Sequence, residues 1–122
     1  MTKRRSGKDG YDREYLEALI EEATVDCYDE YEQAVGLFTK IEDELDLPFT
    51  TRILGVEVAV VAVEQEDDGL GLAAVCERDG ERQSISLSDL PLPSPPPAGT
   101  EWIAAYRHWA RHGGSLNEDD QE

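Results

Sequence analysis

The chain has 122 residues, the size of a single domain. Its 28 Asp and Glu residues against 11 Lys and Arg give a formal net charge of −17, which argues against binding to nucleic acids or to anionic membrane surfaces. No apolar run approaches the roughly 20 residues of a membrane span, and Cys27 and Cys76 lack metal-type spacing, so a cytoplasmic protein with reduced thiols is expected.

The N-terminal third of the chain predicts a tail followed by helix. Residues 1–10 are basic and have no apolar anchor, which predicts a disordered tail. Over residues 12–46 apolar side chains recur at steps of three and four, which is typical of one amphipathic helix or of two. Thr24 marks one expected break, and Gly36 marks either another break or a close helix contact. The helical segment must end before Pro48, because the residue before a proline is disfavoured in the helical conformation.

The segment 49–90 predicts strands, because it is rich in Val and alternates apolar with polar residues. The turn residues Glu-Asp-Asp-Gly at 66–69 and the pair Asp79-Gly80 divide this segment into three or four consecutive strands with short connections. Strands in this order form an antiparallel meander, or a small curled barrel.

The C-terminal part predicts a Pro-rich linker at 91–99 and a short helix over 100–112, capped by Thr100 and followed by an acidic tail at 113–122. The predicted fold class is therefore α+β, with a single domain over residues 11–112. In this domain an acidic helical segment packs on a small antiparallel meander or barrel of three to four strands, and a short C-terminal helix completes it.

The negative charge is concentrated in residues 9–46, which hold fourteen acidic and two basic side chains. Like charges at helical spacing repel each other, so a bound cation or strong solvation must offset their cost. On a continuous helix Asp26, Asp29 and Glu30 would share one face. A dense cluster of mainly carboxylate side chains favours Ca²⁺ over Zn²⁺.

An EF-hand does not explain this cluster. In a loop that starts at Asp26, position 6 is Tyr31 and position 12 is Leu37, so both the glycine and the bidentate glutamate are missing. Any calcium site must be assembled by the fold from helix and turn carboxylates.

Other residues that carry chemistry have ordinary structural explanations. His108 and His112 lie four residues apart and are interpreted as a surface pair at a helix C-terminus. Cys27 and Cys76 are interpreted as small buried hydrophobic residues. No catalytic constellation stands out, and the protein is not expected to be an enzyme.

The stretch DCYDEYEQAVGLFTKIEDELDLPF at residues 26–49 resembles the bacterial CcbP-type calcium-binding protein family. A weaker likeness runs through LGVEVAVVAVE and ERQSISLSDLPLP, so that the resemblance covers about residues 12–93. It implies a compact protein that binds calcium ions through carboxylates outside any EF-hand and acts as an intracellular Ca²⁺ buffer or sensor in bacterial calcium signalling. The ligands that it implies lie among Asp26, Asp29, Glu30, Glu32, Glu42 and Asp43. Further candidates are Glu66, Asp67 and Asp68 in the predicted turn.

Two alternatives stay open. In the first, the chain is an acidic protein–protein interaction module that docks on a basic partner, and its binding weakens with salt and does not depend on calcium. In the second, the acidic surface is solvated without a specific site, and monovalent salt alone stabilises the protein.

Overall fold

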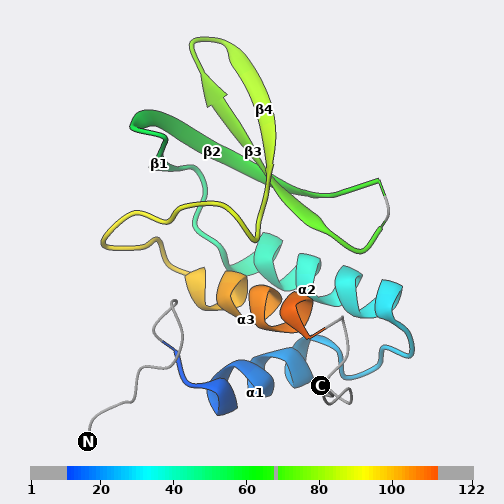
Figure 1. Ribbon diagram of the computed structural model, residues 1–122. Helices are drawn as coiled ribbons and strands as arrows, with labels where there is room; N and C mark the ends of the chain where they lie inside the picture. Colours follow the sequence, from blue (N-terminus) through cyan, green and yellow to red (C-terminus); the bar gives the residue numbers. More distant parts are fainter. Residues whose placement is uncertain (1–10, 68, 113–122) are drawn as a thin grey trace, which may run out of the picture.

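The computed structural model describes residues 11–67 and 69–112, in which three helices lie beside a four-stranded antiparallel sheet (Figure 1). The helices are α1 (Arg13–Ala23), α2 (Glu30–Glu44) and α3 (Thr100–Arg111). The strands are β1 (Phe49–Ile53), β2 (Val56–Gln65), β3 (Leu72–Arg78) and β4 (Glu81–Ser86), and they follow each other in the sheet in chain order. The α+β class and the meander are confirmed. The predicted tails at 1–10 and 113–122 lie outside the described residues.

The acidic helical segment consists of two helices, and the break falls at Thr24 as predicted. A turn over residues 24–29 separates α1 from α2. Gly36 lies inside α2 and marks a close contact, because a Cβ atom at this position would clash with the carbonyl oxygen of Ala23 at the end of α1. The absence of a side chain thus lets α1 and α2 approach each other.

Two tight turns set the register of the sheet. Leu54 and Gly55 join β1 to β2, and Asp79 and Gly80 join β3 to β4; all four residues have positive φ angles, between 52° and 83°. Two-residue turns of this kind match the right-handed twist of the paired strands. The hairpin predicted at Asp79-Gly80 is therefore confirmed.

The hydrophobic core lies between the helices and one face of the sheet. The apolar stripe of α3 is buried, and polar groups at its edge tie α3 to both neighbours. The hydroxyl of Tyr106 accepts a hydrogen bond from the backbone N–H of Leu72 at 3.0 Å, and the indole of Trp109 donates to Oε1 of Gln33 at 2.8 Å. The largest fully buried side chains are Ile20, Leu37, Ile41, Val60, Leu72, Leu87, Leu90 and Ile103.

The Pro-rich linker 91–99 packs against the end of α2. The backbone N–H of Asp46 donates to the carbonyl of Ala98 at 2.9 Å, and Gly99, with φ +91°, lies so close to the carbonyl of Glu44 that a Cβ atom would clash with it. Gly99 is the N-cap residue of α3, so the prediction that Thr100 caps this helix is wrong by one residue. Thr100 is the first helical residue instead, and its hydroxyl donates back to the carbonyl of Pro97 at 2.6 Å.

The prediction of a surface histidine pair is wrong for His108. This residue faces α1 and is buried, because the α1–α3 contact covers it, whereas His112 at the end of the helix is exposed. Cys76 is buried as predicted, and Cys27 is only half-buried in the turn between α1 and α2. None of the described helices is long and apolar enough to cross a membrane.

Candidate calcium-binding site

Four of the six candidate carboxylates gather where the turn 24–29 leads into α2. Asp29 is the N-cap residue, and its Oδ1 accepts a hydrogen bond from the backbone N–H of Glu32 at 2.9 Å. Glu32 reaches back, and its Oε1 accepts from the N–H of Tyr28 at 2.7 Å. This reciprocal capping stabilises the start of the helix. Asp26 and Asp29 precede the helix, so the prediction that they share a helix face with Glu30 is wrong.

The thiol of Cys27 lies close to several of these carboxylates. Its pKa is raised first by burial and then by the nearby charges of Glu32, Asp26 and Asp29. A negative neighbour disfavours the thiolate and equally favours a cation. Three carboxylates from the turn and from the first turn of α2 therefore lie near the Cys27 thiol.

The connection between β2 and β3 brings further acidic residues to the same end of α2 (Figure 1). A Cβ atom on Gly69 would lie 2.8 Å from Cε1 of Tyr31, so this connection touches the first turn of α2. Glu66 and Asp67 lie in the same connection, which is closed by a hydrogen bond of 2.8 Å from the N–H of Gly69 to the carbonyl of Glu66. The sequence marked this connection only as an acidic turn, because nothing in it signals contact with a residue 38 positions earlier. We call the turn 24–29, the first turn of α2 and the connection 66–69 the start site, of which residue 68 is not described.

The other two candidates, Glu42 and Asp43, lie in the last turns of α2 together with Glu44. All three side chains are exposed, and the last turn has no basic residue. The C-terminal end of a helix carries a partial negative charge, so these carboxylates are placed where the dipole disfavours them. We call Glu42, Asp43 and Glu44 the end site.

The start and end sites cannot share an ion. Glu30 and Glu42 are twelve residues apart on one helix, which corresponds to about 18 Å at the usual rise per residue. Calcium–oxygen distances are about 2.3–2.6 Å. The six carboxylates predicted as one cluster therefore form two groups.

The donor chemistry of both groups suits a hard cation, because every candidate side chain supplies carboxylate oxygens. All six are exposed, so their oxygens reach solvent without opening the core. Within residues 11–67 and 69–112, however, no three His, Cys, Asp or Glu side chains already converge on a common point. Coordination would require rotation of surface side chains, which exposed Asp and Glu can make on the nanosecond scale.

A second group of titratable residues lies between α1 and α3, away from these carboxylates. Nε2 of His108 lies 3.2 Å from Oε2 of Glu17, which also pairs with Nε of Arg13 at 3.0 Å. Burial lowers the pKa of His108, although the hydrogen bond to Glu17 opposes this effect. Burial alone would raise the pKa of Glu17, but the hydrogen bonds from Arg13 and His108 lower it below its ordinary value. At neutral pH this group is a neutral imidazole that donates to an ionised carboxylate.

Comparisons with known proteins show the family to which the chain belongs. Residues 17–110 match the model of the family Calci_bind_CcbP, described as calcium binding, and this range contains both carboxylate groups. A search of curated proteins gives no match. The fold is similar to the crystal structure of CcbP from Anabaena, with a TM-score of 0.63 and 21% identity over 90% of this chain and 98% of that one. It is also similar to a calcium-binding protein in its calcium-binding form, with a TM-score of 0.63 and 24% identity over 84% of this chain and 94% of that one. The predicted family and its ion, Ca²⁺, are confirmed, and the chain belongs to the CcbP-type calcium-binding family.

Proposed function

We propose that this protein binds Ca²⁺ at the start site and acts as an intracellular calcium buffer without enzymatic activity. The observation that carries the proposal is the meeting of two acidic segments, the turn into α2 and the β2–β3 connection, through the contact of Tyr31 with Gly69. The ligands come from Asp26, Asp29, Glu30 and Glu32 on one side. Glu66 and Asp67 supply oxygens on the other side.

Calcium accepts this kind of donor set. The ion takes six to eight oxygens in variable geometry, and two chain segments with flexible carboxylates can supply them together with water. The capping bonds engage only Oδ1 of Asp29 and Oε1 of Glu32, so each carboxylate retains a second oxygen for an ion. The helix N-terminus itself disfavours a cation, and the number of carboxylates must outweigh this effect.

A buffer fits the structure better than a sensor does. The candidate side chains are exposed on a fold whose core is closed beneath them, with α1 held against α2 at Gly36. Binding then needs movements of side chains and of the turn, and no helix must leave the core. A sensor would instead have to move a helix to present a new surface.

The end site is the second candidate, with Glu42 and Asp43 as ligands. The observation in its favour is the crowding of carboxylates at the negative end of the α2 dipole without a basic residue in the last turn. A cation there gains from both the side chains and the helix carbonyls. One ion at each end of α2 is compatible with their separation.

Calorimetric titration of chelator-stripped protein with Ca²⁺ and with Mg²⁺ tests this assignment. The start variant Asp26→Asn/Glu30→Gln removes two charges and leaves the caps intact, and the end variant Glu42→Gln/Asp43→Asn removes two charges at the other end. Glu14→Gln/Glu21→Gln on α1 is the matched control for the loss of charge.

We expect the start variant to weaken Ca²⁺ binding by about tenfold or more, which corresponds to about 1.4 kcal/mol. The control should change it far less, because charges that do not coordinate act only through a screened field. Equal weakening by the start variant and the control would show that Ca²⁺ binding depends on the overall charge and not on coordination at the start site. Loss of binding in the end variant alone would move the site to the other end of α2.

A further inference from the structure

The two hairpins of the sheet extend beyond the helical layer (Figure 1). The sheet face that packs on the helices near Val60 continues outward along β2 to Val58 and Val56, because alternate residues of a strand point to the same side. Val60 is opposite Cys76 in the ladder between β2 and β3, so the outer part of β3 contributes to the same face. The outer half of this face has no helix over it in the described part of the chain.

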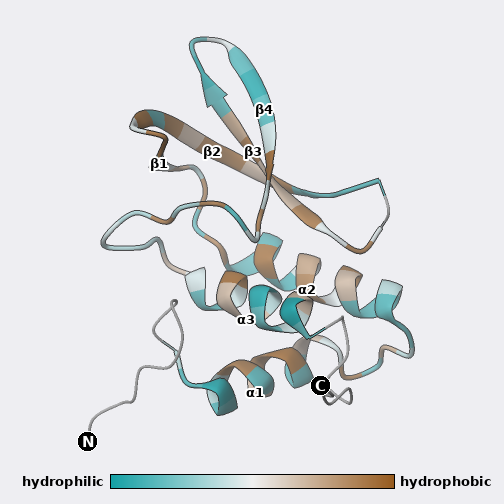
Figure 2. Ribbon diagram, viewed as in Figure 1, coloured by the Kyte–Doolittle hydropathy of each residue, from teal (hydrophilic) through white to brown (hydrophobic). Residues whose placement is uncertain are grey.

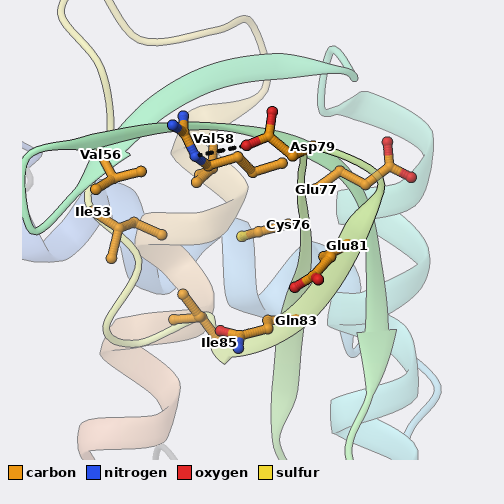
Figure 3. A pocket seen from close by; sticks show the side chains of 10 residues that line it. Ile53, Val56, Val58, Cys76, Glu77, Asp79, Glu81, Gln83 and Ile85 are labelled. Carbon is orange, nitrogen blue, oxygen red and sulfur yellow. Dashed lines mark ion pairs between the residues drawn. The ribbon is translucent and has the colours of Figure 1, made fainter.

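This uncovered half forms a groove of about 430 Å³ between the two hairpins (Figure 3). Ile53, Val56, Val58 and Ile85 line its apolar wall, and Cys76 lies on its floor. A volume of this size is within the range of real ligand sites. The groove is therefore continuous with the apolar sheet face that packs on the helices.

The opposite side of the groove is polar and acidic. The outer end of the β3–β4 hairpin and most of β4 are hydrophilic, whereas β2 is mostly hydrophobic (Figure 2). Asp79 and Glu81 line the groove together with one cation, Arg78, whereas Glu77 turns to the other face of the sheet and accepts a hydrogen bond from Nε of Arg82 at 2.6 Å. Nε of Arg78 already lies 3.6 Å from Oδ2 of Asp79, and its guanidinium donates to the carbonyl of Glu57 at 3.0 Å. The groove therefore combines an apolar wall with a polar rim on which two carboxylates, Asp79 and Glu81, face one cation, Arg78.

The groove also lies beside strand edges that can accept another strand. In the part of the chain that the structure describes, β1 and β4 each pair with a single neighbour, and both contribute residues to the groove. Exposed edge strands are templates for pairing with an extended segment of another protein. The apolar side of the groove is exposed as well, since 97% of Leu54 at its end and 41% of Val56 is accessible to solvent.

We propose that this groove docks an extended segment of a basic partner protein, in which apolar residues alternate with Lys or Arg. Apolar side chains on one face of the segment enter between Val56, Val58 and Ile85, and its cations meet Glu81 and Asp79. The charge of −17 steers a cationic partner toward this chain and repels a second copy of the chain. The proposal does not depend on calcium binding at α2.

A defined peptide tests the groove. The probe is a synthetic peptide of strand length in which Lys alternates with Val, capped at both ends, and the control peptide replaces each Val with Ser at the same charge. Each is titrated into the ¹⁵N-labelled chain of 122 residues while backbone amide shifts are followed. Val56→Thr/Val58→Thr keeps the β-branched shape and removes the apolar wall, and Glu81→Gln removes one rim charge at an exposed position.

We expect the Lys–Val peptide to shift amides of β1, β2 and β4 around the groove and to bind about tenfold more tightly than the Lys–Ser peptide. The Val56→Thr/Val58→Thr variant should lose that preference, and Glu81→Gln should weaken both peptides at low salt. Equal binding of the two peptides, or shifts confined to the acidic α2, would overturn the proposal. Reversible dimerisation of the protein that Val56→Thr/Val58→Thr abolishes would also overturn it, because the groove would then serve a second copy of the chain.

Discussion

The two ends of α2 carry similar numbers of carboxylates, yet the structure uses them differently. At the start, Asp29 and Glu32 cap the helix, and their negative charge complements the positive end of the dipole. At the C-terminus of α2, Glu42, Asp43 and Glu44 lie at the negative end of the helix dipole, without a basic neighbour in the last turn. An acidic cluster is therefore stabilising or destabilising according to where the fold places it.

This contrast separates the role of the carboxylates in folding from the role in ion binding that we propose for them. At the start site the charges are favourable for the empty protein, and the contact of Tyr31 with Gly69 brings the β2–β3 connection to the same end of the helix. At the end site they are unfavourable for the empty protein and lie in one short stretch of chain. Variants at the two ends should consequently change stability with opposite sign, whichever end binds the ion.

The largest effect is expected at Gly99, which holds the Pro-rich linker against the end of α2. Gly99→Ala should lower the free energy of unfolding by about 3 kcal/mol or more, because a Cβ atom would clash with the carbonyl of Glu44 and φ is +91°. Chemical denaturation measures it. Gly80→Ala is the matched control, with φ +83° and open space around the new atom, and should lose only about 1 kcal/mol. Equal losses would show that the end of α2 is not tightly covered.

Asp29→Ala tests the start of α2. It should lower the free energy of unfolding of calcium-free protein by about 1 kcal/mol, because it removes the acceptor that caps the N–H of Glu32. Asp29→Asn retains an acceptor and should lose much less. If thermal or chemical denaturation gives the same loss for both substitutions, then charge and not capping explains the role of Asp29.

Acid should lower the stability of the protein through His108, a residue of α3 that packs against α1. Burial lowers the pKa of this residue in the folded protein, whereas in the unfolded chain it titrates near the ordinary value of about 6.5. The unfolded state thus binds more protons below that pH, so the free energy of unfolding should decrease as pH falls below about 6.5 and stay level above it.

Denaturation at several pH values, with His108→Gln and the exposed His112→Gln as a pair, checks this prediction. The slope below pH 6.5 should flatten only in His108→Gln. Carboxylates act at lower pH, since Glu17 has a lowered pKa and its contribution is lost only when the pH falls through that value. A slope that persists in His108→Gln would assign the acid sensitivity to other groups.

The smallest effect is expected at the end of α2. Asp43→Asn should raise the free energy of unfolding of calcium-free protein by about 0.5 kcal/mol at low salt, because it removes a charge that the dipole and its neighbours disfavour. The gain should shrink at high salt. A loss of stability would mean that the carboxylates at this end already have a favourable partner.

Much of the fold follows from local chemistry in the sequence. The hairpin at Asp79-Gly80, the break at Thr24 and the helical stripe of α3 were predictable, because turn residues and apolar period act over a few positions. The choice between a break and a close contact at Gly36 was not, because the carbonyl of Ala23 reaches it only through tertiary packing. The same holds for His108, whose burial depends on the α1–α3 contact.

The candidate site was predictable in composition but not in arrangement. The predominance of carboxylates indicated a hard cation, and the family resemblance indicated Ca²⁺. The sequence did not reveal that the turn 24–29 removes Asp26 and Asp29 from the helix, nor that Tyr31 would meet Gly69 and bring the connection 66–69 to α2. Both depend on how the chain folds back on itself, which no local pattern encodes.

A crystal structure of the protein grown with excess Ca²⁺, with the ion located by its anomalous signal, tests the central claim most directly. We predict an ion at the start site with about six to eight oxygens at about 2.3–2.6 Å, drawn from the 26–32 segment, from Glu66 and Asp67, and from water. An ordered start site whose carboxylates point into solvent with no ion between them would contradict the account.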